Sequence, residues 1–467
     1  MKNKFLRHIS GLFASLLIIT VPFSSYAGVL DDMEERKTWE VQSNLIENWP
    51  EGPAIGAASA VLMEADTGII LYEKNMHDQM YPASTTKLMT CLLAMEKEGA
   101  SLNDMVDFSV EAVYSCPYDG SNMGIDAGES MTLEDGLYGI LLLSANEVSN
   151  GVGEYVSGDA ESFVNLMNER AKELGCTDTH FNNAHGYTDS EHYTSAHDLA
   201  LIAREFFKNE LLAKISRTLT YHWYATDTQP DDIYLSTKNY FVRGIYECEG
   251  LVGSKTGYTD ESRNCLVTCA ERNGMRLICV IMKEETPYQY EDTLALFNYG
   301  FNNFEKIKVS DYETRYTMDS ENFFKTDYDV FGDSSSFLSL DTDSEIILPK
   351  NCEFSDLYST LTYRDDGSNV LADISYSYNG KYLGEATLVT EVNKEQSFVF
   401  SNEDEFMEES TEEEQTFIYV NRIVRWVAIA AGVLVLILIL KKIISSFHFA
   451  RRRKYIIRDS RKRREDK

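Results

Sequence analysis

The order of strand and helix patterns along the chain constrains its fold more than any other feature of the sequence. Residues 57–75 predict a β-hairpin, because two apolar-alternating runs are joined by the turn signal Asp66-Thr67-Gly68. Helical patterns then follow at about 84–98, 132–143, 160–174 and 195–208. Strand patterns return at 249–259, 264–271 and 275–282, before a last helical pattern at about 290–304. Strands at both ends with helices between them predict an α+β fold: an antiparallel sheet covered by helices, with a helical subdomain.

Local signals support parts of this assignment. The turn Arg272-Asn273-Gly274 makes the last two strand patterns a good hairpin. Thr132 with Asp135, and Ser195 with Asp198, are capping-box variants that carry Asp in place of Glu. They predict where two of the helices begin.

The composition changes after the last helical pattern. Short alternating runs rich in Ser, Asp, Tyr and Thr, with an Asn379-Gly380 hairpin signal, predict a small all-β domain over 306–400. Residues 401–416 are acidic and of low complexity, which predicts an extended linker. We therefore expect the main folded domain to occupy residues 28–305.

The two ends of the chain carry export and membrane signals. Residues 1–27 combine early basic residues, a short apolar run and small residues before Ala27, which predicts a cleaved signal peptide; an uncleaved anchor is the alternative. Residues 417–440 are apolar enough and long enough to predict a transmembrane helix. The tail at 441–467 has 12 basic and 3 acidic residues, so the positive-inside rule places it in the cytoplasm. We expect a single-pass protein of the cell membrane whose folded part faces the outside.

Charge and cysteine content limit the partners and the chemistry. The net charge is −32, and it becomes −46 when residues 1–27 and 421–467 are left out. Such an acidic surface excludes nucleic acid as a partner, whereas the basic tail suits anionic lipid headgroups. Eight cysteines in an exported chain allow disulfides but match no zinc-ligand spacing. Cys91 and Cys279 lie within apolar runs, which favours packed thiols there and leaves the pairing of the others open.

One stretch, "YPASTTKLMT" at residues 81–90, carries a candidate catalytic pair. Ser84 and Lys87 are three residues apart at the start of an apolar helix, so their side chains are surface neighbours. A neutral lysine could take the proton of the serine, and the unpaired N–H groups of a helix start could hold an oxyanion. Alone, the pair favours the simpler interpretation of a capping serine followed by an exposed lysine.

Two further stretches strengthen the catalytic interpretation. "LLLSANE" places Ser144 and Asn146 just after an apolar helical run, and "GSKTGYT" places Lys255, Thr256 and Gly257 in a strand suited to a sheet edge. Separately they are compatible with a polar helix end and with an edge lysine that blocks aggregation. Three such stretches in this order are hard to attribute to chance.

The triplet resembles that of the penicillin-binding proteins and serine β-lactamases. Within that group the chain is similar to the low-molecular-mass D-alanyl-D-alanine carboxypeptidases. Beyond the triplet, the segments that carry the resemblance include "MTLEDGLYGILLLSANE", "FNNAHGYTDSEHYTSAHDLALIAR" and "GLVGSKTGYTDESRNCLVTCAERNGMRLICVIM". The resemblance covers about residues 50–305 and extends more loosely over 306–395.

The resemblance implies a hydrolase that trims the terminal D-Ala from peptidoglycan stem pentapeptides and is inhibited by β-lactam antibiotics. Ser84 would be the acylated nucleophile, Lys87 its general base, and Ser144 a proton relay toward the leaving D-alanine. The backbone N–H groups of Ser84 and Tyr258 would form the oxyanion hole. No cofactor and no metal are implied.

The resemblance also implies a set of substrate-binding residues. Asn146 would bind the substrate backbone, Lys255 would supply positive potential, and Thr256 would help to hold the terminal carboxylate. Gly257 would let the ligand backbone approach closely, next to Tyr258.

Some positions depart from the family pattern. Gln289 stands where relatives often carry an arginine that helps to bind the substrate carboxylate, and Ala184 replaces a commoner proline before His185. We interpret His185 as structural, and His192 and His197 as satisfied surface groups. Residues 218–236 are acidic and are expected to shape only the rim of the cleft.

Three other functions are alternatives to the carboxypeptidase. A β-lactamase shares the triplet, but no segment suggests the dedicated Glu-bearing loop that it needs for deacylation. A non-catalytic receptor for muropeptides or β-lactams is disfavoured by the intact Ser84, Lys87 and Lys255. A metal hydrolase is disfavoured because the eight histidines include no His-Glu-x-x-His pattern.

Overall fold

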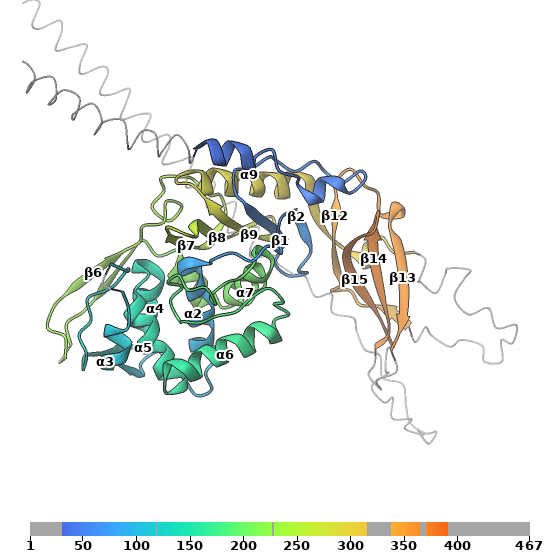
Figure 1. The fold of residues 1–467 in the computed structure, drawn as a ribbon. Coiled ribbons are helices and arrows are strands. Elements are labelled where there is room, and N and C mark those ends of the chain that lie inside the picture. Colours follow the sequence, from blue (N-terminus) through green and yellow to red (C-terminus); the bar gives the residue numbers. More distant parts are fainter. Residues whose placement is uncertain (1–29, 118, 227, 315–337, 365–369, 391–467) are drawn as a thin grey trace, which may run out of the picture. The chain divides into compact units, whose positions relative to one another are not determined.

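The computed structural model describes residues 30–117, 119–226, 228–314, 338–364 and 370–390. Its central element is a five-stranded antiparallel sheet with the strand order β2-β1-β9-β8-β7 (Figure 1). The strands are β1 (Ser59–Glu64), β2 (Ile70–Lys74), β7 (Leu251–Thr259), β8 (Arg263–Arg272) and β9 (Met275–Glu284). Pairing of β1 with β9 joins the two strand-rich parts of the sequence into one sheet, as predicted.

Helices cover both faces of this sheet. α9 (Tyr288–Asn303) packs against one face, and α7 (Ala196–Lys208) packs against the other (Figure 1). Along β9, Leu277 and Cys279 belong to the core on the α9 side, whereas Ile278 and Val280 belong to the core shared with α7. Successive strand residues point to opposite faces, so a strand covered on both sides is apolar at every position. This explains the unbroken apolar run of the sequence there.

The helical subdomain lies between β2 and β7 in the sequence. Its elements are α2 (Lys87–Glu96), β3 (Met105–Asp107), α3 (Val110–Tyr114), β4 (Ser130–Thr132), α4 (Leu133–Tyr138), α5 (Asn146–Ser157), α6 (Ala160–Glu173), α8 (Glu210–Ser216), β5 (Thr220–Trp223) and β6 (Ile233–Ser236). The side chain of Thr132 accepts a hydrogen bond from the backbone N–H of Asp135, and Ser195 accepts one from Asp198. Both predicted caps therefore begin helices α4 and α7.

Two of the predicted helices are divided. The first starts as the 3-10 turn η2 (Ala83–Thr86) before α2, and the second passes from α4 into the π-helical turn η3 (Gly139–Leu143). Helix α5 was not predicted, although Val148, Val152, Tyr155 and Val156 recur at helical spacing, because two glycines in NEVSNGVGEYVS disfavour a helix locally. These glycines pack closely in the fold: a Cβ at Gly151 would lie 2.5 Å from Phe108, and one at Gly153 would lie 2.8 Å from Phe163. The helix α8 and the β5–β6 hairpin were also not predicted.

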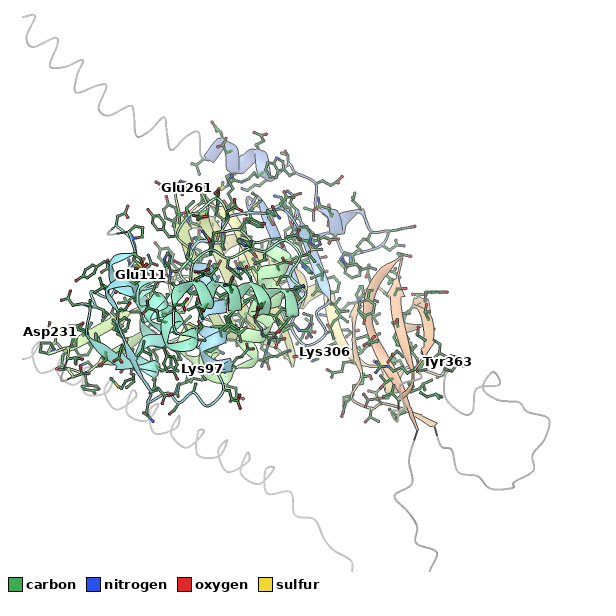
Figure 2. The ribbon with its side chains drawn as sticks, turned by 60° about the horizontal axis from the view of Figure 1, so that its bottom comes forward. Lys97, Glu111, Asp231, Glu261, Lys306 and Tyr363 are labelled. Atoms are coloured by element: carbon green, nitrogen blue, oxygen red, sulfur yellow. The ribbon has the colours of Figure 1, made fainter. Side chains whose placement is uncertain are left out.

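The described residues after α9 are mainly strands. β10 (Phe304–Lys308) pairs with β12 (Glu345–Pro349), and a second sheet has the order β11-β15-β14-β13, formed by Leu338–Leu340, Lys381–Thr390, Val370–Tyr378 and Tyr358–Tyr363. Three further 3-10 turns are η1 (Gln42–Leu45), η4 (Val309–Asp311) and η5 (Phe354–Asp356), and residues 30–36 are helical. The predicted Asn379-Gly380 turn joins β14 to β15. Lys306, labelled in Figure 2, forms ion pairs with Asp66 at 2.7 Å and Glu345 at 2.9 Å, which link the β1–β2 turn to β12.

The predicted signal peptide, linker, transmembrane helix and tail (1–27, 401–416, 417–440 and 441–467) lie outside the described residues. Within the described ranges, no helix combines the length and the apolar character that a membrane crossing requires. All eight cysteines lie within the described ranges as free thiols, and Cys91 and Cys279 are buried, which confirms the packed-thiol interpretation for these two.

Candidate active site

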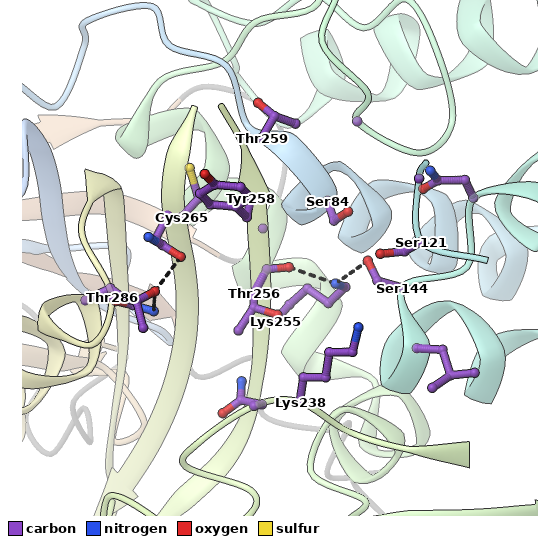
Figure 3. Close-up of a pocket in the computed structure, with 18 of the residues that line it drawn as sticks. Ser84, Ser121, Ser144, Lys238, Lys255, Thr256, Tyr258, Thr259, Cys265 and Thr286 are labelled. Carbon is purple, nitrogen blue, oxygen red and sulfur yellow. Dashed lines mark hydrogen bonds between the residues drawn. The ribbon is translucent and has the colours of Figure 1, made fainter. Parts of the chain in front are cut away.

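A cleft of about 690 Å³ opens where η2, the η3–α5 corner and the edge strand β7 meet (Figure 3). Seven of the eight predicted site residues line it, namely Ser84, Ser144, Asn146, Lys255, Thr256, Gly257 and Tyr258. The eighth, Lys87, is fully buried beside Ser84. The structure thus brings together residues that are up to 174 positions apart in the sequence.

Lys87 has three hydrogen-bond partners at the base of the cleft. Its Nζ lies 3.1 Å from Ser84 Oγ, 2.8 Å from Asn146 Oδ1 and 2.5 Å from the backbone oxygen of His185. A neutral amine has two N–H donors and one lone pair. The two carbonyl-type oxygens can therefore take the two N–H groups, which leaves the lone pair to accept the proton of Ser84.

The surroundings of Lys87 favour this neutral form. Burial lowers the pKa of Lys87 well below its usual value, and the nearby positive charge of Lys255 lowers that pKa further. Burial also lowers the pKa of Lys255, to about 8. A general base that must be neutral near physiological pH is thereby available in the folded protein.

The opposite wall of the cleft holds a second lysine–serine pair. Lys255 Nζ donates to Ser144 Oγ at 3.0 Å and to the backbone oxygen of Thr256 at 2.8 Å (Figure 3). Ser144 adopts a left-handed backbone conformation, with φ +63°, directly after η3. This sharp turn separates η3 from α5, so Ser144 and Asn146 project into the cleft from one corner.

Close packing of backbone segments shapes the floor of the cleft. A Cβ on Gly257 would lie 2.9 Å from the backbone oxygen of Pro82 and 3.0 Å from the backbone nitrogen of Ser84. Gly186 has φ +84°, and a Cβ there would lie only 1.8 Å from the backbone oxygen of Ala83. Because both positions lack a side chain, β7 and the 183–186 loop can approach the turn that carries Ser84.

Comparison with known proteins identifies the family. The family model described as D-alanyl-D-alanine carboxypeptidase matches residues 46–286, which is more than half of the chain. The chain belongs to the D-alanyl-D-alanine carboxypeptidase family. This confirms the family that the sequence motifs predicted.

Pairwise comparison of this D-alanyl-D-alanine carboxypeptidase family member with individual proteins gives the same family. The chain is 37% identical over 250 residues to D-alanyl-D-alanine carboxypeptidase DacF of Bacillus subtilis, a match that covers 53% of this chain and 63% of that protein. It is 28% identical over 359 residues to DacA of Haemophilus influenzae, covering 72% of this chain and 84% of the relative. The match to the Bacillus protein thus spans less than two thirds of its length.

Solved structures extend the similarity to the fold. Penicillin-binding protein 5 of Haemophilus influenzae is similar with a TM-score of 0.57 and 26% identity, over 73% of this chain and 98% of that structure. Penicillin-binding protein 6B of Escherichia coli is similar with a TM-score of 0.56 and 25% identity, over 74% of this chain and 98% of that structure. These neighbours confirm the predicted α+β fold.

Two histidine predictions have different outcomes. His185 is buried, and its pKa is lowered to about 3 by burial and by Lys87. Its backbone oxygen accepts from Lys87 Nζ and its ring Nδ1 accepts from the Tyr187 N–H, which agrees with a structural role. The prediction that His192 is a surface group was wrong, because this side chain is buried. Its Nδ1 accepts from Asn182 N–H, and its Nε2 lies 2.8 Å from Thr86 Oγ1, so it supports the turn between Ser84 and Lys87. His197 is partly exposed beside Asp198.

Sequence reasoning missed Glu147, a buried carboxylate at the start of α5. It accepts hydrogen bonds from the backbone N–H groups of Met123 and Gly124. The segment that contains Met123 and Gly124 also contributes Asp119, Gly120 and Ser121 to the lining of the cleft. Glu147 directly follows Asn146, but a single glutamate at a helix start carries no signal that it is buried.

Proposed function

We propose that this protein is a serine D-alanyl-D-alanine carboxypeptidase that removes the terminal D-Ala from peptidoglycan stem peptides. The observation that carries the proposal is the buried Lys87, whose Nζ lies 3.1 Å from Ser84 Oγ and whose pKa is lowered by its surroundings. The family match and the D-alanyl-D-alanine carboxypeptidase names of the relatives support the same reaction.

In the proposed acylation step, Ser84 Oγ attacks the carbonyl carbon of the penultimate D-Ala while its proton passes to Lys87 Nζ. The developing oxyanion is held by the backbone N–H groups of Ser84 and Tyr258. As the C–N bond breaks, Ser144 delivers a proton to the leaving D-alanine nitrogen. Lys255 Nζ, 3.0 Å from Ser144 Oγ, is placed to support this transfer.

Substrate binding in the proposal uses the edge strand and the opposite corner. Because β7 is the last strand of its sheet, its outer edge can pair with an extended peptide. Asn146 would bind the peptide backbone, and Lys255 with Thr256 would hold the terminal carboxylate. Gly257 would leave room for the peptide to approach. Water would then release the shortened peptide from Ser84, and a β-lactam would acylate the same serine.

We further propose that the enzyme is exported and held in the cell membrane by residues 417–440, with the folded part facing the cell wall. The support for this placement is the sequence pattern of those residues and the basic tail behind them.

Release of D-alanine from a synthetic peptide ending in Lys-D-Ala-D-Ala tests the reaction, with the full chain in detergent and its Ser84→Ala variant. We expect release by the unmodified protein and none by the variant. Failure of the unmodified protein to release D-alanine, while penicillin still attaches to Ser84, would refute the carboxypeptidase and favour another acyl donor in the wall. Absence of both reactions would favour the receptor alternative.

A further inference from the structure

Gln289, in the first turn of α9, is a buried polar residue that lines the cleft and leaves one atom unpaired. Its side chain is only 4% exposed, and its Oε1 has no hydrogen-bond partner among the described residues. Its Nε2 lies 3.3 Å from Thr286 Oγ1. A buried acceptor without a donor is unfavourable by itself, so this oxygen is suited to a ligand that brings a donor.

Neighbouring hydrogen bonds determine which way the amide of Gln289 faces. Asn264 donates through Nδ2 to the backbone oxygen of Glu284 at 3.1 Å, so its Oδ1 faces Thr286. Thr286 Oγ1 donates its only proton to this Oδ1 at 2.9 Å (Figure 3). Thr286 can therefore only accept from Gln289. This places the NH₂ group of Gln289 toward Thr286 and leaves its oxygen free.

The strand register places Gln289 near the end of the cleft proposed for the substrate terminus. Thr256 pairs with Leu266 and Tyr258 pairs with Asn264 across β7 and β8. Side chains of paired residues point to the same face of a sheet, and Leu266 belongs to the core on the α9 side. Thr256 therefore lies on the face of the sheet covered by α9, on which Gln289 also lies. Lys255 projects from the opposite face.

An amide oxygen at this position repels a carboxylate oxygen and attracts an N–H group. We propose that Gln289 is a specificity-determining residue that lets the cleft accept leaving groups carrying an amide N–H where a free terminal carboxylate would otherwise lie. The substrate class is a D-Ala-D-Ala peptide whose last carboxyl is amidated or is itself joined in a peptide bond. The chemistry stays that of the proposed function, on which this inference rests: Ser84 takes the acyl group, and D-alaninamide leaves as a neutral amine.

Two matched peptides test the proposal, diacetyl-Lys-D-Ala-D-Ala and the same peptide with a C-terminal carboxamide, with kcat/KM measured for both by the full chain. We expect the carboxamide to be hydrolysed at least as well as the acid. Gln289→Arg should shift the ratio toward the acid by about tenfold or more, because it replaces an acceptor by a cation that can pair with a carboxylate. Gln289→Leu removes both the acceptor for the carboxamide N–H and the repulsion of the carboxylate, so it should also shift the ratio of the two rates toward the acid.

Gln79→Arg is the matched control, because Gln79 is exposed and is not among the residues that line this cleft. It adds the same charge and should leave the substrate ratio unchanged. A strong preference of the unmodified enzyme for the acid, unchanged in both Gln289 variants, would overturn the proposal.

Lack of hydrolysis of both peptides would instead contradict the proposed function. In that case, the ratio between the acylation rates of Ser84 by benzylpenicillin and by its carboxamide replaces the ratio between the two peptides. A ratio that Gln289→Arg shifts toward benzylpenicillin would support the role of Gln289, and an unchanged ratio would overturn it.

Discussion

Replacement of Gly257 by alanine tests whether close approach of β7 to the nucleophile turn is required for acylation. The new Cβ would lie 2.9 Å from Pro82 O, 3.0 Å from Ser84 N and 3.1 Å from Ala83 Cβ. Gly257 does not have a positive φ, so steric contact rather than backbone strain causes the effect.

The size of the effect follows from these distances. An ordinary contact of a Cβ is 3.4–4 Å, so β7 and η2 must separate by about 0.5 Å. Two of the three contacted atoms belong to the backbone and cannot rotate away. Overpacking of this kind costs about 1–3 kcal/mol of the free energy of unfolding. A displacement of this size between Ser84 and the backbone N–H of Tyr258 should slow acylation by about 10- to 100-fold, which corresponds to about 1.4–2.8 kcal/mol in the barrier.

The second-order rate constant for acylation of Ser84 by benzylpenicillin is the quantity to measure, together with thermal unfolding followed by circular dichroism. Gly136→Ala is the matched control, because its Cβ would lie 3.3 Å from a side-chain methyl group of Val152, with no backbone atom among its nearest contacts, and outside the cleft. The control should acylate at the rate of the unmodified protein. Acylation of Gly257→Ala at an unchanged rate would refute the close-approach argument.

Three further predictions concern charge and thiols. Lys255→Met should move the acid limb of the acylation pH profile to higher pH, because loss of the Lys255 charge raises the pKa of Lys87; an unmoved limb would contradict this. The pKa of Glu284 is raised to about 8 by burial and by Asp292, so the folded state keeps this proton longer than the unfolded state. Stability in urea should therefore fall from pH 5 to pH 9, and Glu284→Gln should reduce that fall; an equal fall in both would contradict the assignment. Thiol titration of denatured, unreduced protein should find eight thiols, and fewer would reveal a disulfide.

Local features of the fold were predictable because they depend on residues close in sequence. The β1–β2 and β8–β9 hairpins follow from alternation and turn residues, and the caps at Thr132 and Ser195 depend on a residue three positions later. The separation of Ser84 and Lys87 by three residues likewise brings their side chains together within one helical turn. Their contact therefore needs little from the rest of the chain.

Features that depend on burial or on distant residues were not predictable in the same way. Helix α5 contains Gly151 and Gly153, which disfavour a helix locally, but in the fold they allow aromatic rings from other segments to pack closely against it. Histidine is a polar residue that was expected to be exposed at position 192, but residues distant in sequence bury its side chain. Turn η3 interrupts the pattern at 132–143, which predicts one continuous helix, and the left-handed Ser144 directly follows it.

The sequence alone therefore determined the order of the five central strands and of the helical patterns between and after them, the positions of the chemically active side chains and, through their motifs, the family. Tertiary structure decided whether those side chains can react. Lys87 is a candidate base because Asn146, 59 residues away, and the His185 carbonyl, 98 residues away, surround it, while burial and Lys255 lower its pKa. Desolvation and charge interactions depend on which atoms are near in space, and only the folded chain determines that.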